Sequence, residues 1–378
     1  MATLAGCARD VDVTLPTWST WMALLVAACT THAPPAPSTP PASSAIPPHE
    51  PGATAIALPA PGATPIAVPG VIGPASIDYI GYEPRGNRIW VPVGNTGSVD
   101  VFDIATARFD RVDGFKSVER DTRGRKRIIG PSAVSIGEGI AYVGNRATSE
   151  VCAVDTKSLK LGQCLALAQA TDGVEYVAST KEVWVTTPRD HSLTVLDASD
   201  PRLLKPKIVV KLEGESEGYG VDEIRGRFFT NLEDTDRTVV VNLKTHRVES
   251  IWKPGCGEAG PRGLTVDAVR DFVFVACTDH VQILDAGHGG ALLGKLDTGA
   301  GVDNIDYLAE KALLYVAAGR AARLTIARVD DQGHFAVVAT AATSDGARSV
   351  VADAQGNAYV ADPGNARLLV FPLVPPKN

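Results

Sequence analysis

Residues 89–103, IWVPVGNTGSVDVFD, carry the pattern that decides the fold: a hydrophobic strand with an aromatic residue, a polar turn, and a second strand with an acidic end. This pattern occurs seven times, with an acidic residue, an amide or, in the last copy, Phe371 at its end. Strands that alternate in this way bury side chains on both faces of a sheet. The further copies are AYVGNRATSEVCAVD (141–155), VWVTTPRDHSLTVLD (183–197), FFTNLEDTDRTVVVN (228–242), VFVACTDHVQILD (273–285), LYVAAGRAARLTIARVD (314–330) and AYVADPGNARLLVF (358–371).

The spacing of the copies predicts the architecture. They end at residues 103, 155, 197, 242, 285, 330 and 371, which are 52, 42, 45, 43, 45 and 41 residues apart. Such a period, with four short strands in each unit, is typical of a β-propeller blade. Each copy supplies the second and third strands, and turns such as Gln355-Gly356-Asn357 join the first strand to the second. We therefore expect an all-β, seven-bladed propeller of four-stranded antiparallel blades.

The last blade lacks a fourth strand, because few residues follow Phe371. The segment Thr64–Val71 (TPIAVPGV) precedes the first blade and has the composition of an outer strand, where Pro65 and Pro69 are tolerated at a sheet edge. We expect this N-terminal strand to close the ring, which places the propeller at residues 64–378.

The copies at 89–103 and 141–155 resemble the YVTN-type repeats of the YncE-like β-propeller family, and AYVADPGNARLLVF (358–371) resembles an NHL repeat. The resemblance implies the seven-bladed architecture. Related propellers include scaffolds, surface-layer proteins, nucleic-acid binders and lactonase-type hydrolases. The resemblance therefore does not define an activity.

The composition excludes some functions. With 36 Gly and 26 Pro the chain is unsuited to a helical bundle, and 43 acidic against 36 basic residues give a net charge of -7. An acidic chain has no global attraction for duplex nucleic acid. We expect a monomer.

The N-terminal residues predict export. Residues 21–28 (WMALLVAA) form a short apolar run that ends in small residues, as in a secretory signal. Because VAAC (26–29) resembles a bacterial lipobox, we expect residues 1–29 to be a signal peptide and Cys29 to be lipidated. Residues 30–63 are rich in Pro and Ala and are predicted to be a disordered linker. The expected location is the periplasm or outer membrane of a bacterium, as a tethered lipoprotein.

Four cysteines lie in the predicted propeller, and an exported domain favours disulfides. Cys152 and Cys164 lie on neighbouring strands of the second blade, twelve residues apart across a turn. Cys256 precedes the first strand of the fifth blade, and Cys277 ends its second strand, so both are expected at the same face. We predict the pairs Cys152–Cys164 and Cys256–Cys277.

Aligning the first strands by the residues that lead into them predicts two rings around the central channel. The four carboxylates of the deeper ring would repel one another unless they bind a cation, most simply Ca²⁺, or are protonated. The alternative is that backbone amides or hydroxyls satisfy each carboxylate separately. The predicted mouth ring is Ala75, Ser132, Asp172, Tyr219, Arg262, Asp303 and Arg348, and the deeper ring is Asp78, Ser135, Glu175, Asp222, Thr265, Asp306 and Val351.

Basic residues and histidines are also expected at the mouth. Arg262 and Arg348 either pair with the aspartates of their ring or hold an anionic ligand. The insertion 117–129 (SVERDTRGRKRII), with Arg125 and Arg127, is expected to be a loop over the mouth that is either solvated or holds phosphate, single-stranded nucleic acid or an acidic surface. His191 and His280 are expected in loops on the same face.

No HExxH motif of metal-dependent hydrolases and no P-loop is found in the sequence. The leading hypothesis is a non-enzymatic, membrane-tethered module that binds a ligand or a protein partner at the channel mouth. One alternative is a metal-dependent hydrolase or lactonase that uses Asp78, Glu175, Asp222 and Asp306. The other is a single-stranded nucleic-acid binder that uses residues 120–127.

Overall fold

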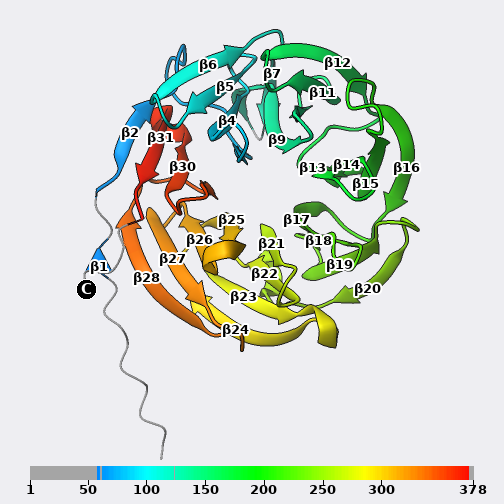
Figure 1. Cartoon of the computed structure of the whole chain (residues 1–378), viewed down its shortest axis with the longest axis vertical. Coiled ribbons are helices and arrows are strands. Elements are labelled where there is room, and N and C mark those ends of the chain that lie inside the picture. Colours follow the sequence, from blue (N-terminus) through cyan, green and yellow to red (C-terminus); the bar gives the residue numbers. More distant parts are fainter. Residues whose placement is uncertain (1–57, 60–61, 123, 374–378) are drawn as a thin grey trace, which may run out of the picture. The chain divides into compact units, whose positions relative to one another are not determined.

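Each copy of the repeat forms the second and third strands of a four-stranded antiparallel blade. In the first blade, β4 (Arg88–Val93) and β5 (Ser98–Asp103) lie between β3 (Gly81–Glu83) and β6 (Arg108–Val112). Seven such blades follow one another around a ring (Figure 1). The structure is a computed structural model that describes residues 58–59, 62–122 and 124–373. The predicted all-β propeller is confirmed.

The next five blades follow the same order from the inner to the outer strand. The second blade contains β9 (Pro131–Gly137), β10 (Ile140–Asn145), β11 (Glu150–Asp155) and β12 (Lys160–Ala166), and the third contains β13 (Val174–Val177), β14 (Glu182–Thr187), β15 (Ser192–Asp197) and β16 (Lys205–Lys211).

The fourth blade contains β17 (Ser216–Asp222), β18 (Arg227–Leu232), β19 (Arg237–Asn242) and β20 (Val248–Trp252). The fifth contains β21 (Leu264–Asp267), β22 (Phe272–Ala276), β23 (His280–Asp285) and β24 (Ala291–Asp297), and the sixth contains β25 (Val302–Leu308), β26 (Leu313–Ala318), β27 (Arg323–Val329) and β28 (Phe335–Ala342).

The ring closes by pairing of strands from opposite ends of the chain. The seventh blade contains β29 (Ser349–Ala352), β30 (Ala358–Asp362) and β31 (Arg367–Phe371), and its outer strand is β2 (Thr64–Ala67). Thr64 lies opposite Val370 and Ala67 opposite Arg367 in an antiparallel register. The structure therefore has the predicted closing strand, and Figure 1 shows β2 beside β31.

The hydrophobic core consists of clusters packed between neighbouring blades. The aromatic residue of each second strand is buried there, with at most 1% of its surface exposed. In every blade this residue lies directly opposite a residue of the first strand. These residues are Trp90, Tyr142, Trp184, Phe229, Phe274, Tyr315 and Tyr359.

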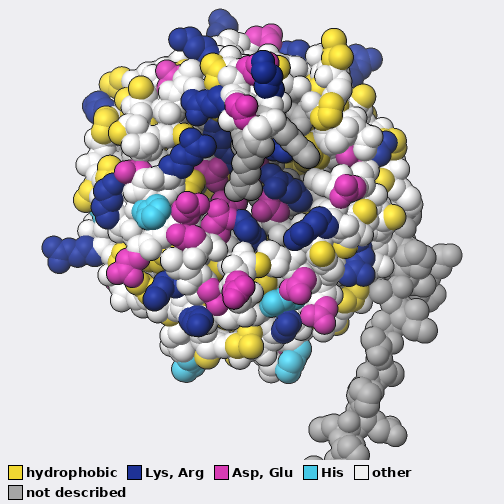
Figure 2. Space-filling model, turned by 180° about the vertical axis from the view of Figure 1, so that it is seen from behind, with side chains coloured by type: hydrophobic (Ala, Val, Ile, Leu, Met, Phe, Trp, Pro, Cys, Tyr) yellow, Lys and Arg dark blue, Asp and Glu magenta, His cyan; other side chains and the backbone are white. Residues whose placement is uncertain are grey.

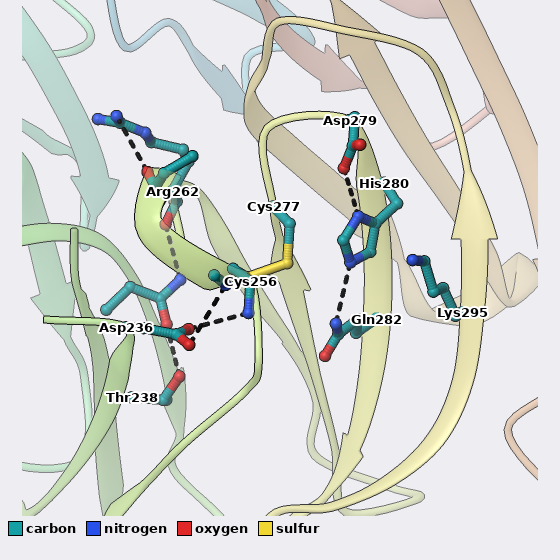
Figure 3. Close-up of a disulfide and its surroundings, with 12 residues drawn as sticks. Asp236, Thr238, Cys256, Arg262, Cys277, Asp279, His280, Gln282 and Lys295 are labelled. Carbon is teal, nitrogen blue, oxygen red and sulfur yellow. Dashed lines mark hydrogen bonds and ion pairs between the residues drawn. A yellow bond between two sulfur atoms is a disulfide. The ribbon is translucent and has the colours of Figure 1, made fainter. Parts of the chain in front are cut away.

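Both predicted disulfides are present. Cys152 on β11 lies directly opposite Cys164 on β12, with an S–S distance of 2.02 Å. Cys256 precedes the short 3-10 helix η2 (Gly257–Ala259) and bonds to Cys277 after β22, with an S–S distance of 1.95 Å (Figure 3). The first bridge holds an outer strand to its blade, and the second holds the loop that leads into the fifth blade.

The insertion at 117–129 is a hairpin rather than a simple loop. Strands β7 (Val118–Thr122) and β8 (Arg125–Ile129) pair antiparallel, and Lys126 Nζ lies 2.8 Å from Glu119 Oε1 across the pair. Ser117 Oγ donates to Gly94 O at 2.6 Å in the turn between β4 and β5. This contact places the hairpin on the face formed by turns between second and third strands. In the described part of the chain, no helix is both long and apolar enough to cross a membrane.

Candidate binding site at the channel mouth

The innermost strands surround a central cavity of about 410 Å³. In each blade, the inner-strand residue that lies opposite the buried aromatic residue of the second strand lines this cavity. These seven residues lie at the same height along the channel, which we call the cavity level, because strand register sets which residues lie side by side. The residues at this level are Gly81, Ser135, Glu175, Gly220, Thr265, Asp306 and Val351.

Asp78 and Asp222 are absent from this level, so the structure corrects the predicted deeper ring at two blades. In the first blade the inner strand begins only at Gly81, which places Asp78 three residues closer to the mouth. In the fourth blade the register shifts between Ser216 and Tyr219, which puts Gly220 opposite Phe229. Asp222 lies fully buried at the far end of β17, where Arg227 Nη2 donates to its Oδ2 at 2.6 Å.

The residues three positions before the cavity level form the mouth. Glu217 and Asp78 lie at the positions predicted for Tyr219 and Ala75, because the alignment of the inner strands was displaced in the fourth and first blades. Figure 2 shows acidic side chains gathered at the centre of one face of the ring, with basic side chains around them. The mouth residues are Asp78, Ser132, Asp172, Glu217, Arg262, Asp303 and Arg348.

Two arginines bind three of the mouth aspartates. Arg146 Nη2 lies 2.8 Å from Asp78 Oδ2 and also contacts Asp172. Arg348 Nε lies 3.0 Å from Asp303 Oδ2, and its Nη2 lies 3.6 Å from Asp78 Oδ1. The alignment of inner strands missed Arg146, because this residue follows β10 in a turn; the turn sequence Gly-Asn-Arg was the only available signal.

Glu217 is the one mouth carboxyl group that has no arginine partner among the described residues. Among the described residues, no lysine or arginine lies within ion-pair distance of it, and its contact is Tyr79 Oη, which donates to Oε1 at 3.5 Å. Burial, followed by repulsion from Asp172 and Asp303, raises the pKa of Glu217 well above its usual value. The pKa of Asp172 is also raised, chiefly by burial, although Arg146 lowers it. The mouth therefore has four carboxyl groups for two bridging arginines, and the ionised forms of Glu217 and Asp172 are disfavoured there.

Two tyrosines line the cavity next to the mouth residues. The rings of Tyr79 and Tyr219 lie 5.8 Å apart, and Tyr219 Oη donates to Val174 O at 3.0 Å. Burial raises the pKa of both phenols well above the usual value, so both remain protonated and able to donate hydrogen bonds. Tyr219 thus lines the cavity beneath the mouth, whereas the sequence alignment predicted it in the mouth ring.

The predicted cation ligands do not fit a calcium site. Asp306 accepts backbone hydrogen bonds from Tyr307 at 2.9 Å and Ala352 at 2.7 Å, and Glu175 accepts one from Ser135 Oγ at 3.3 Å. Calcium requires six to eight oxygen atoms at about 2.3–2.6 Å. No three of the four predicted carboxylates bring oxygens within 4.8 Å of one another in the described residues. Asp306 thus has two backbone donors of its own, and Glu175 has one hydroxyl donor.

The remaining mouth residues lie around this network. Arg262 pairs with Glu233, and its Nη2 lies 3.4 Å from Ala259 O in the loop held by the Cys256–Cys277 disulfide (Figure 3). His191 is exposed after the 3-10 helix η1 (Pro188–Asp190). Arg127 is exposed on the hairpin, and the side chain of Arg125 lies outside the described residues.

The expectation that His280 lies in a loop is wrong. It is the first residue of β23 and is buried, because the turn after Cys277 closes with a backbone hydrogen bond of 2.9 Å from Cys277 N to His280 O. Its Nδ1 lies 2.5 Å from Asp279 Oδ1, and its Nε2 lies 2.9 Å from Gln282 Nε2 (Figure 3). These neighbours occupy both ring nitrogens, and His280 is part of the blade structure.

The chain is a β-propeller, and comparisons with solved structures support this class. It resembles a chain of Kuenenia stuttgartiensis hydrazine synthase (15% identity, TM-score 0.66, covering 81% of this chain and 99% of that one). It also resembles a chain of a mitotic checkpoint complex (11% identity, TM-score 0.67, covering 83% of this chain and 95% of that one). A third similar structure is the β-propeller domain of Myceliophteria thermophila Cps50 (Swd1) (10% identity, TM-score 0.64, covering 80% of this chain and 98% of that one). No protein-family model and no curated protein sequence matches the chain. At these identities the similarity establishes the fold alone.

Proposed function

We propose that this protein is a binding module whose channel mouth receives a cationic group, such as a lysine or arginine side chain of a protein partner. The observation that carries the proposal is that the mouth has a buried carboxyl group without a cationic partner in the described structure. Asp78, Asp172 and Asp303 share Arg146 and Arg348, whereas Glu217 adds a fourth carboxylate with no cation at ion-pair distance in the described structure.

A cation from a partner would pair with this carboxyl group. At a separation of 4 Å and an effective dielectric constant of 20, one ion pair is worth about 4 kcal/mol before the cost of desolvation. After that cost, a net gain of about 1–3 kcal/mol is reasonable for a hydrogen-bonded charge pair. The cavity beneath the mouth leaves room for part of a ligand, and Tyr79 supplies a hydroxyl beside Glu217.

Two features extend the proposal. One similar structure is a chain of a mitotic checkpoint complex, which illustrates the same fold inside a protein assembly. The sequence of residues 1–63 further supports export and attachment through a lipid on Cys29, and these residues lie outside the described structure except for 58–59 and 62–63. We therefore propose a partner in the cell envelope.

The test is a titration with penta-lysine, monitored by calorimetry at low salt. Glu217→Gln removes this carboxyl group, and Glu310→Gln is the matched control, since Glu310 is exposed in η4 (Ala309–Lys311) at the opposite ends of the strands. We expect Glu217→Gln to weaken binding at least about fivefold, or about 1 kcal/mol, and Glu310→Gln to leave it unchanged. Equal weakening by both variants would show attraction to net charge alone. Tighter binding of penta-glutamate would reverse the proposed sign of the ligand.

A further inference from the structure

The segment ahead of the first blade contains a short tandem repeat. Residues 52–59 read GATAIALP and residues 62–69 read GATPIAVP, which are identical at six of eight positions. The second copy supplies β2, the outer strand of the seventh blade. The described part of the first copy, Leu58–Pro59, forms β1 and pairs in parallel with β28, the outer strand of the sixth blade. The second copy is therefore an outer strand itself, and the described part of the first copy pairs with the outer strand of the preceding blade (Figure 1).

The outer strand of the sixth blade differs from the others in composition. Exposed edge strands commonly carry charged residues, which oppose pairing with other strands. Strand β28 reads FAVVATAA and has no charged residue, although it is eight residues long. The outer strands of the first five blades each contain at least one charge: RFDRV in β6, KLGQCLA in β12, KPKIVVK in β16, VESIW in β20 and ALLGKLD in β24.

The packing of β28 is also that of a covered strand. Val338, Ala339 and Ala341 are partly buried against the core cluster between the sixth and seventh blades, and Ala63 packs against the same cluster. By contrast, six of the seven residues of β16 are exposed. Leu58 lies opposite Ala339, near the centre of β28.

We propose that the outer edge of β28 is a docking site for the first copy of the repeat, so that the segment ahead of the ring is bound on two successive blades. Addition of a strand to an exposed sheet edge relies on main-chain hydrogen bonds, and small apolar side chains allow close approach. The absence of charge on β28 permits this pairing, and the charges on β6, β12, β16, β20 and β24 oppose it elsewhere. The proposal is independent of the function of the mouth.

Amide hydrogen exchange on the full chain tests the docking. One variant replaces residues 53–58 (ATAIAL) with SGSGSG, and the matched control makes the same replacement at residues 40–45 (PPASSA). We expect exchange in residues 335–342 to accelerate at least about tenfold in the first variant. The control should match the wild type, and residues 367–371 should stay protected in both, because β2 is intact.

A monomeric variant whose residues 335–342 stay as protected as in the wild type would overturn the proposal. A variant that becomes dimeric while the strand stays protected would support it, because the vacated edge has then accepted a strand from a second copy. Size-exclusion chromatography with light scattering distinguishes these outcomes. If the block replacement does not fold, the milder variant Ile56→Gly with Leu58→Gly is read by the same criteria.

Discussion

Replacement of Arg146 by methionine tests the electrostatics of the mouth most directly. Arg146 is the shared cation of Asp78 and Asp172, and its side chain is 30% exposed. Each attraction is worth about 4 kcal/mol at 4 Å and an effective dielectric constant of 20. Because the arginine is partly solvated and its own desolvation offsets much of this attraction, we expect a net loss of about 2–4 kcal/mol in the free energy of unfolding.

Two further replacements, of one arginine and one lysine, provide reference values for the loss in the free energy of unfolding. Arg348→Met removes a side chain that is 48% exposed, and we expect a loss of about 1–2 kcal/mol. Lys126→Met removes the 77% exposed partner of Glu119 on the hairpin and should change stability by less than about 0.5 kcal/mol. Urea unfolding at pH 7.5, followed by circular dichroism, measures all three. Equal losses for Arg146→Met and Lys126→Met would refute the reasoning.

The pH dependence of Arg146→Met provides a second criterion. Without Arg146, the raised pKa of Asp172 should rise further, because that arginine lowers it in the wild type. Between the unfolded and folded pKa values the native state binds more protons, so the variant gains stability as the pH falls through this window. The deficit relative to the wild type should therefore be smaller at pH 5 than at pH 7.5. A larger deficit at pH 5 would contradict this account.

Three other changes have defined outcomes. Glu217→Gln should stabilise the protein at pH 8 and have a smaller effect at pH 4, because the raised pKa of Glu217 means that its ionised form disfavours the native state; urea unfolding at both pH values checks this. Burial raises the pKa of Glu175 to about 7, so wild-type stability should fall as the pH rises from about 4.5 to 7, and Glu175→Gln should remove this part of the pH profile. Replacing either cysteine pair by alanines should cost about 3 kcal/mol, slightly more for the pair separated by 21 residues than for the pair separated by 12, and equal stability of reduced and oxidised protein would contradict it.

The fold was predictable from the sequence because one pattern repeats at a nearly constant period, and because a missing last strand demands a first strand elsewhere. The disulfides followed from the same register, since Cys152 and Cys164 lie on neighbouring strands of one hairpin. The hairpin β7–β8 was not predicted, because its alternation is carried by charged residues rather than by apolar ones.

The residues of the candidate site were harder to predict from the sequence, because their positions depend on the exact register of the inner strands. Alignment by the residues that lead into each inner strand fails where a strand starts late, as at Gly81, or shifts, as between Ser216 and Tyr219. Alignment on the buried aromatic residues of the second strands would have placed Asp78 and Glu217 at the mouth. Arg146 would still have been missed, since no inner-strand alignment includes a turn between second and third strands.

Most buried carboxylates of the blades are matched by cations, whereas Glu217 has no cation at ion-pair distance among the described residues. Asp362 pairs with Arg367 at 2.7 Å and Asp267 with Arg270 at 2.9 Å, each within its own blade. A channel that served only to hold the blades together would gain stability from the same arrangement. Glu217 instead lowers stability at neutral pH, and such costs are typical of residues kept for binding. Glu217→Gln should therefore raise stability and weaken the binding of penta-lysine in the same protein, whereas a purely structural Glu217 would change only the first property.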